Sequence, residues 1–298
     1  MTLFDRLVDE ALRQQSDLAP LRMVVEKELL HHDILREMAE AGLLQALTFI
    51  GGTCLRACYG SNRLSEDLDF TGGTEFDRAA LACLGDVLVE RLQAKYGLSV
   101  RVSEPVRDSG KVATWKMRVM TRPGRHDLPV QRINIDICAI PSHDRRPMLL
   151  RNPYGVDMGT SGLILQAESR DEILADKLIA FVLRPNRIKH RDIWDIGWLV
   201  QQGTELPLVL IPAKIKDHQR TTPDFLARLK ERRRQLLEDA EIQAGFVREM
   251  ARFLPQGMIA KTLMQEAFWS WLTELIADMC KKTEAALDAS ETTRSFPM

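Results

Sequence analysis

Two aspartates separated by one residue are the strongest candidates for chemistry in this sequence. Asp67 and Asp69 lie in the tetrapeptide 67–70, whose composition is that of a short acidic strand. Side chains at positions i and i+2 of a strand leave the same face, so the two carboxylates would lie side by side. Like charges this close are unfavourable unless a cation compensates them, and Mg²⁺ prefers carboxylate oxygens. The pair predicts a metal site, with an exposed, solvated strand end as the alternative.

Asp136 is the candidate for a third metal ligand. It lies in the segment 131–139, where Ile133, Ile135 and Ile137 alternate with polar residues. Period-two alternation predicts a strand with Asp136 on the face opposite the isoleucines. Asp136 would complete a metal site, and activate an acceptor hydroxyl, if its strand lies beside the strand of Asp67 and Asp69. A surface position unrelated to the site explains the residue equally well.

The turn formed by Gly51, Gly52 and Thr53 is the candidate phosphate site. It separates the short apolar run 46–50 from the segment 53–59, which can open a helix. Glycine lets a ligand approach the main chain, and the free N–H groups at a helix N-terminus favour an anion. The alternative is a simple turn in which Thr53 caps the helix.

The elements that must position these residues follow an α/β pattern up to about residue 205. Helices are predicted over residues 21–41, 76–96, 171–185 and 191–202, and strands over 46–50, 67–70, 99–102, 113–120 and 131–139. The proline-punctuated segment 203–223 is the expected connector to a helical C-terminal portion.

Composition and charge restrict the functional classes. The 298 residues are 45% hydrophobic, which allows one large domain or two smaller ones with a sizeable core. A net charge of -1 means that any attraction to nucleic acid must come from a local patch. The five cysteines form no CxxC motif, and no apolar stretch approaches the length of about 18 residues that spans a bilayer. We expect a soluble cytoplasmic protein with reduced thiols.

Two sequence segments carry a resemblance to a known family. Residues 49–56 read F-I-G-G-T-C-L-R and residues 63–70 read R-L-S-E-D-L-D-F. Together they resemble the AbiEii/AbiGii type IV toxin family of nucleotidyltransferases, a branch of the DNA polymerase β-like nucleotidyltransferase superfamily. A lysine-bearing helix around Lys177 and the R-D-x-x-D segment 191–195 match later family motifs. The resemblance covers about residues 24–199; Ile50 and Leu64 depart from the usual lysine and aromatic residue, which bears on substrate choice more than on chemistry.

The resemblance implies a fold and an activity. The implied fold is α/β (α+β): a polymerase β-like nucleotidyltransferase domain with a mixed sheet over residues 1–205, followed by a helical C-terminal region over residues 206–298. The implied reaction uses Mg²⁺ or Mn²⁺ to transfer a nucleoside monophosphate from a nucleoside triphosphate, with release of pyrophosphate. The acceptor would be an RNA, such as a tRNA 3′ end, or a protein. The chain would be a toxin whose antitoxin partner is encoded elsewhere.

The resemblance also implies roles for individual residues. Asp67 and Asp69 would bind the metal, with Asp136 as the third ligand. The predicted catalytic residues are Asp67, Asp69, Asp136, Lys177 and Asp195. The predicted nucleotide contacts are those of Gly51, Gly52, Thr53, Arg63, Ser65, Lys177 and Asp192. Without the family, Lys177 reads as an exposed helix lysine, and Asp192 and Asp195 as ion-pair partners of Arg191.

A cluster of basic residues is the candidate surface for a macromolecular partner. Its members in the connector and the following helix are Lys214, Lys216, Arg220, Arg228, Lys230, Arg232, Arg233 and Arg234. Such a cluster suits the phosphates of RNA or an acidic antitoxin, and a solvated helix face is the alternative.

Two rival functions follow from other features. One is a non-catalytic nucleotide-binding module of a toxin–antitoxin or regulatory system. The other is a metal-dependent phosphodiesterase, for which His31, His32 and Asp33 are the only suggestive run. On a helix we expect that run to lie partly exposed, and the carboxylate pattern favours the nucleotidyltransferase.

Overall fold

The helices and strands separate into two units in the computed structural model, which describes residues 2–105, 112–122, 124 and 130–294. The first unit comprises Met1–Glu168 and Phe253–Pro255, and the second Ser169–Arg252 and Gln256–Met298. All described strands belong to the first unit, and the described part of the second is helical. That the nucleotidyltransferase domain extends to residue 205 stays a prediction, because the limits of an activity need not coincide with those of a compact unit.

The described strands of the first unit form one mixed sheet of seven strands in the order β3-β4-β5-β2-β1-β7-β6. Two neighbouring pairs, β2 with β5 and β1 with β7, are parallel, and the other pairs are antiparallel. The strands are β1 (Thr48–Ile50), β2 (Leu68–Thr71), β3 (Ser99–Ser103), β4 (Val112–Met120), β5 (Gln131–Cys138), β6 (Arg145–Leu149) and β7 (Ile164–Glu168).

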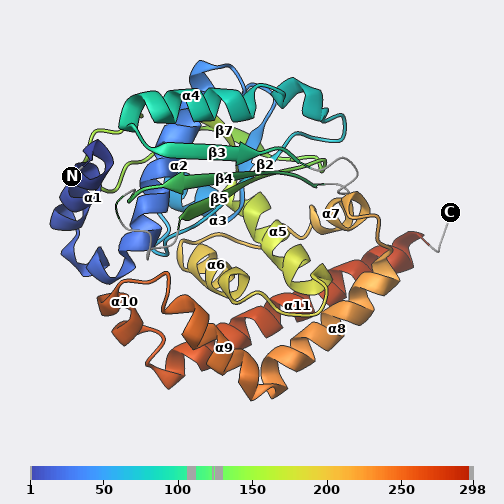
Figure 1. The fold of residues 1–298 in the computed structure, drawn as a ribbon. Coiled ribbons are helices and arrows are strands. Elements are labelled where there is room, and N and C mark those ends of the chain that lie inside the picture. The colour runs from blue at the N-terminus through green and yellow to red at the C-terminus, as the bar shows by residue number, and fades with distance from the viewer. Residues whose placement is uncertain (1, 106–111, 123, 125–129, 295–298) are drawn as a thin grey trace. The chain divides into compact units, whose positions relative to one another are not determined.

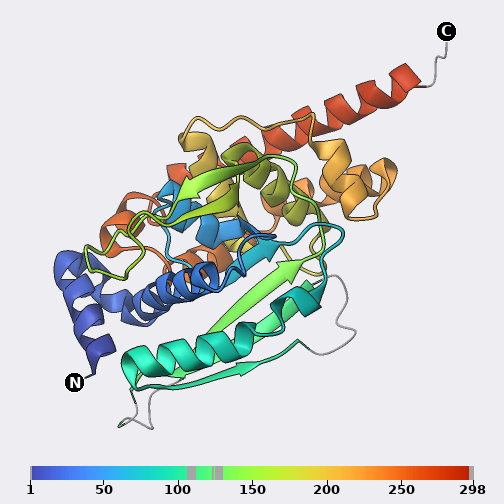
Figure 2. The same cartoon turned by 90° about the horizontal axis from the view of Figure 1, so that it is seen from above.

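Helices α2 (Arg22–Glu40) and α4 (Leu84–Tyr96) cover one face of this sheet (Figures 1 and 2). The residues that β4 and β5 direct toward them, such as Trp115, Ile133 and Ile135, are buried. Burying each of these side chains stabilises the unit by about 1.5–3 kcal/mol, which fixes the register of the strands. The polar residues that alternate with them must therefore lie on the opposite face, where the predicted carboxylates are found.

The structure confirms the predicted strands of the first unit and adds two. The two added strands are β6 and β7. β6 reads R-R-P-M-L, and its charges and proline, which are typical of an edge strand, mask the strand pattern. The helix expected over 76–96 is interrupted: a 3₁₀ helix, Arg78–Leu81, precedes α4. The remaining helices of this unit are α1 (Leu3–Gln14), a 3₁₀ helix over Ser16–Leu21, and α3 (Gly51–Cys54), which is followed by a π-helical turn, Leu55–Tyr59.

The second unit is built from helices. They are α5 (Arg170–Leu183), α6 (His190–Gln201), α7 (Ile211–Asp217), α8 (Thr222–Glu238), α9 (Ala240–Met250), α10 (Gln256–Lys261) and α11 (Glu266–Arg294). α5 and α6 match the predicted helices. The connector expected over 203–223 contains the helix α7. Pro212 does not prevent this helix, because it lies in the first turn, where the backbone N–H that proline lacks would have no partner within the helix. No helix in the described part of the chain is both long and apolar enough to cross a bilayer.

Candidate active site

Three carboxylates come together on the face of the sheet opposite α2 and α4. β2 and β5 are parallel neighbours, and their register pairs Asp69 with Asp136 directly. Asp67 lies immediately before β2, and the Asn134 N–H of β5 donates to its Oδ1 atom at 3.0 Å. The condition under which Asp136 would join the other two aspartates is therefore met. All three side chains are partly exposed, whereas Leu68 is buried on the other face.

Neighbouring polar groups orient two of these carboxylates. The Thr114 hydroxyl of β4 donates to Oδ1 of Asp136 at 2.6 Å, across the β4–β5 pair. The Asn134 N–H holds Asp67 in the same way. These hydrogen bonds restrict the rotation of the Asp67 and Asp136 carboxylates.

Gly51 makes room for Asp69. Its φ angle is +76°, in the left-handed region, and a Cβ atom at this position would lie 2.8 Å from Oδ2 of Asp69. The close approach follows from the pairing of β1 with β2, which sets Ile50 opposite Asp69. Both the backbone conformation and the contact require glycine at position 51. The position of the Asp69 carboxylate therefore depends on the Gly51 turn.

Gly52 makes room for Arg63. A Cβ atom on Gly52 would lie 2.0 Å from Nη2 of Arg63, so the guanidinium packs directly against the turn. Arg63 is only 2% exposed, and its Nη1 donates to the Leu64 carbonyl at 3.2 Å. The predicted nucleotide contact of Arg63 is not tested by these distances, but its position is that of a support for the turn.

Thr53 and Ser65 tie the turn to the segment that precedes Asp67. Their hydroxyl oxygens lie 2.6 Å apart, and the Thr53 hydroxyl also donates to the Asp67 carbonyl. Both residues are buried. The alternative role of Thr53 as a helix cap is wrong, because α3 begins at Gly51 and Ile50 is its N-cap residue.

Glu28 of α2 anchors the same segment from the protein interior. Its Oε1 accepts the Ser65 N–H at 2.8 Å, and its Oε2 accepts from Arg56 Nε at 3.1 Å and from the Tyr154 hydroxyl. Burial and the neighbouring Glu28 carboxylate raise the pKa of Tyr154, which keeps the phenol a donor. Sequence reasoning missed this group: the one signal is an acidic residue within an amphipathic helix, and that signal names no partner.

The His31-His32-Asp33 run lies in the interior, so the expectation that it is partly exposed is wrong. A ring nitrogen of His31 lies 3.0 Å from the Glu66 carbonyl, and one of His32 lies 3.1 Å from the Thr160 hydroxyl. Asp33 accepts from Lys95 Nζ at 2.6 Å. Burial lowers the pKa of His32 to about 4. The run packs α2 into the unit, and the phosphodiesterase hypothesis loses its only suggestive motif.

The other predicted site residues form an ion cluster in the second unit. Lys177 Nζ of α5 lies 2.9 Å from Oδ1 of Asp192 and 2.8 Å from Oδ2 of Asp195, both on α6. Arg184 Nη2 lies 3.2 Å from the other oxygen of Asp192. Lys177 is 8% exposed, so its alternative interpretation as an exposed helix lysine is wrong. Burial opposes ionisation of Asp192, but the surrounding cations outweigh it and lower its pKa.

The basic cluster expected after residue 203 is largely neutralised. Lys214 is 1% exposed and lies 2.5 Å from Glu172 and 2.8 Å from Asp176, so its expected place on the surface is wrong. On α8, Arg228 pairs with Asp224 at 3.0 Å. Lys230 and Arg233 pair with Glu284, and Arg234 pairs with Glu231 and Glu238. This surface presents ion pairs rather than a field of positive charge.

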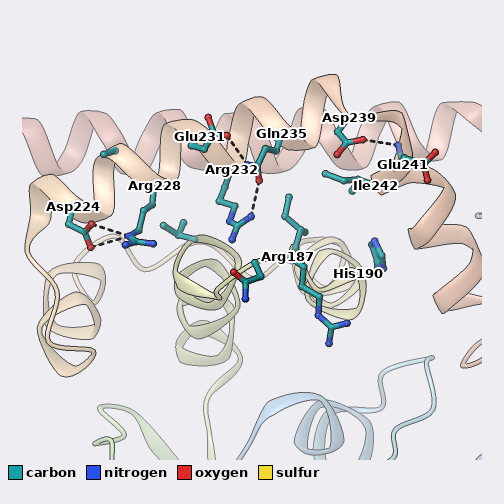
Figure 3. A pocket seen from close by; sticks show the side chains of 14 residues that line it. Arg187, His190, Asp224, Arg228, Glu231, Arg232, Gln235, Asp239, Glu241 and Ile242 are labelled. Atoms are coloured by element: carbon teal, nitrogen blue, oxygen red, sulfur yellow. Dashed lines mark hydrogen bonds and ion pairs between the residues drawn. The ribbon is translucent and has the colours of Figure 1, made fainter.

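A cavity of about 770 Å³ in the second unit is separate from every predicted site residue. It is lined by α8, the α5–α6 link and the start of α9, and Figure 3 shows Arg228 directed toward Asp224 on its wall. Acidic and basic side chains alternate along it, so its charge selects neither an anion nor a cation.

The fold and the site define a class of protein. A mixed sheet that brings two aspartates of one strand segment beside a third on the next strand, next to a Gly-Gly turn that opens a helix, is the arrangement that the sequence predicts for a nucleotidyltransferase. MenT4, a nucleotidyltransferase toxin from Mycobacterium tuberculosis, has a similar structure, with a TM-score of 0.51 and 16% identity over 95% of this chain and 98% of that one.

Residues 33–274 match the family of the nucleotidyl transferase AbiEii toxin of type IV toxin–antitoxin systems, and the chain belongs to that family. It is therefore a toxin-type nucleotidyltransferase, for which the family implies a nucleoside triphosphate substrate and an antitoxin partner. JHP933 from Helicobacter pylori has a TM-score of 0.47 and 15% identity over 96% of this chain and 97% of its own. A search of curated proteins found no match.

Proposed function

We propose that this toxin transfers a nucleoside monophosphate from a nucleoside triphosphate in a reaction that depends on Mg²⁺ or Mn²⁺ held by Asp67, Asp69 and Asp136. The observation that carries the proposal is the direct pairing of Asp69 with Asp136, with Asp67 held to the same strand by the Asn134 N–H. Three partly exposed carboxylates on one face fit a hard divalent cation, which prefers carboxylate oxygens.

The residues of the first unit divide the work of transfer. The backbone of Gly51, Gly52 and Thr53 at the start of α3 binds phosphate oxygens, supported by the buried side chains of Arg63 and Ser65. Asp136 accepts the proton of the acceptor hydroxyl, whose oxygen bonds to the α-phosphorus as the bond to pyrophosphate breaks. When bound, the metal ion would offset negative charge on the phosphates.

Lys177, Asp192 and Asp195 stay predicted residues of the nucleotide site. Lys177 Nζ forms ion pairs with Asp192 and Asp195 at 2.9 and 2.8 Å, so a triphosphate that binds Lys177 would compete with these two carboxylates. In this proposal the two aspartates hold the Lys177 ammonium, and the triphosphate competes with them for it.

The acceptor that we propose is an RNA with a free 3′ hydroxyl, such as a tRNA 3′ end, with a protein hydroxyl as the second class. The reaction requires nucleotides at cellular concentration, which is why we also propose that the toxin acts in the cytoplasm, where its antitoxin would restrain it.

The direct test supplies each α-³²P-labelled nucleoside triphosphate with Mg²⁺ and total RNA to the wild type and to Asp67→Ala/Asp69→Ala. A matched control is Asp86→Asn, which removes an exposed carboxylate of α4. We expect label on RNA with the wild type and the control only, and none when EDTA is present.

Two outcomes would overturn the proposal. Label transfer by the double variant would remove the aspartates from the chemistry. Nucleotide binding without transfer to RNA or protein would instead favour the non-catalytic nucleotide-binding module.

A further inference from the structure

Three arginines lie directly opposite one another on adjacent strands of the first unit. The register of β3 with β4 pairs Arg101 with Arg118, and that of β4 with β5 pairs Arg118 with Arg132. Neighbouring strands lie about 4.8 Å apart, so the three side chains leave the sheet within about 10 Å of each other. We call these residues the arginine ladder.

The arginine ladder lies on the same face as the carboxylates. Exposure alternates along all three strands, and the ladder residues are exposed while their neighbours Val100, Met117 and Val119 are buried. Arg132 precedes Asp136 by four residues on β5, an even number, so both side chains leave one face, about 13 Å apart along the strand.

Lys116 bridges the space between the ladder and the carboxylates. It is exposed, it precedes Arg118 by two residues on β4, and it is paired with Asn134, whose N–H donates to Asp67. On this face of the sheet, in the direction from Arg132 to Asp136, the three arginines come first, then Lys116, and then the carboxylates.

No ion pair or side-chain hydrogen bond joins Arg101, Lys116, Arg118 or Arg132 to any other residue that the structure describes. This contrasts with the cations of α8, which have acidic partners. Like charges set directly opposite each other in a sheet are destabilising, so the arginine ladder lowers the stability of the folded protein when no anion is bound. A ligand with regularly repeated negative charge would relieve this repulsion.

We infer that the arginine ladder and Lys116 bind the phosphate backbone of the RNA acceptor and direct its 3′ hydroxyl to Asp136. This inference rests on the proposed function. The open face of these strands, where the structure describes it, carries no aromatic side chain on which a base could stack. Recognition there is of the backbone and tolerates different sequences, which leaves selection of the acceptor to other parts of the protein.

The test compares Arg101→Gln/Arg118→Gln/Arg132→Gln with a matched triple variant, Arg6→Gln/Arg91→Gln/Arg248→Gln. The control removes three exposed arginines from helices α1, α4 and α9. The probe is a short single-stranded RNA with a fluorophore at its 5′ end, titrated at several salt concentrations. Thermal unfolding checks that both variants fold, and replacing the ladder by lysines should restore most of the binding.

We expect the ladder variant to bind the RNA at least about 30-fold more weakly, and the slope of log K against log salt to fall by about 2, since each phosphate contact contributes about 0.7. Its affinity for nucleoside triphosphate should equal that of the control. Equal RNA binding by the two triple variants would overturn the inference. It would also be overturned if the ladder variant lost only the binding of an acidic antitoxin and still bound RNA as the control does.

A failure of the inference can be told from a failure of the proposed function. If the wild type labels RNA and the ladder variant does so with the same KM for RNA, transfer stands and the ladder assignment falls. If the wild type binds RNA through the ladder but transfers no label, the ladder stands and the proposed function falls.

Discussion

The two groups of predicted site residues, the carboxylates of the first unit and the Lys177 cluster of the second, both place negative charges close together, but in different surroundings. In the first unit Asp69 and Asp136 lie side by side and partly exposed, held by neighbouring polar groups and by the space above Gly51. In the second unit Asp192 and Asp195 are buried and share the ammonium of Lys177. The first group lies partly exposed on the face of the sheet, whereas the second is buried around a shared ammonium.

The comparison separates residues that should govern activity from residues that should govern stability. A partly exposed carboxylate can be neutralised at small cost to the fold, because water screens the interactions that it makes. A carboxylate or cation inside a buried ion cluster cannot, because its partner is left charged and without compensation. The following predictions test that division.

The largest effect should come from Asp69→Asn. We expect kcat/KM for nucleotidyl transfer to fall at least about a thousandfold, about 4 kcal/mol, because the carboxylate that faces Asp136 is lost. The free energy of unfolding should change by less than about 1 kcal/mol, because Asp69 is partly exposed. Steady-state transfer assays and urea denaturation measure the two quantities. A variant that unfolds more easily than the wild type would place Asp69 in the structural group.

Lys177→Met should have the next largest effect, here on stability. It leaves Asp192 and Asp195 buried with one fewer cation, and we expect the free energy of unfolding to fall by about 3 kcal/mol. Lys216→Met on α7 is the control, because Lys216 is exposed. Urea denaturation of both variants gives the comparison. Equal stability of the two would show that the cluster contributes nothing to folding.

Gly51→Ala should affect both quantities. Alanine at a φ of +76° costs about 1–2 kcal/mol, and its Cβ would displace the Asp69 carboxylate. The matched control is Gly97→Ala, where φ is +65° and a Cβ would meet no atom within 4 Å. We expect similar losses of stability and, for Gly51→Ala alone, a loss of kcat of at least about tenfold. Equal activity of the two variants would contradict the role of the turn in placing Asp69.

The sequence predicted much of the fold because its signals are local. Alternation of Ile133, Ile135 and Ile137 identified β5 and the face of Asp136, and the Gly51-Gly52 turn identified the start of a helix. Strand order is not local: nothing in residues 67–70 states that β5 is their neighbour. The direct pairing of Asp69 with Asp136 therefore became visible only in the sheet.

Charges were harder to interpret than apolar periodicity. Lys214 and Arg228 lie in a basic run of sequence, but their acidic partners come from other turns or other helices and neutralise them. Arg101, Arg118 and Arg132 are far apart in the sequence and form no run, yet strand register brings them together. A charge cluster is therefore a property of the register and the packing, which the linear sequence does not state.

The smallest predicted effect is a pH dependence of stability from Lys189, which lies beside the ion cluster of the second unit. Burial lowers the pKa of Lys189 to about 8; Asp192 opposes this, and the nearby cations Lys177, Arg191 and Arg184 add to it. In the unfolded chain the ordinary value is 10.5, so between pH 8 and pH 10.5 the unfolded state binds more protons than the folded state. Stability contributed by this group must therefore rise with pH across that window. Urea denaturation from pH 8 to pH 10.5 should show the rise in the wild type and in Lys216→Gln, and a smaller rise in Lys189→Gln. The same slope in all three would mean that the cluster can accept a further cation at no cost, and its contrast with the carboxylates of the first unit would weaken.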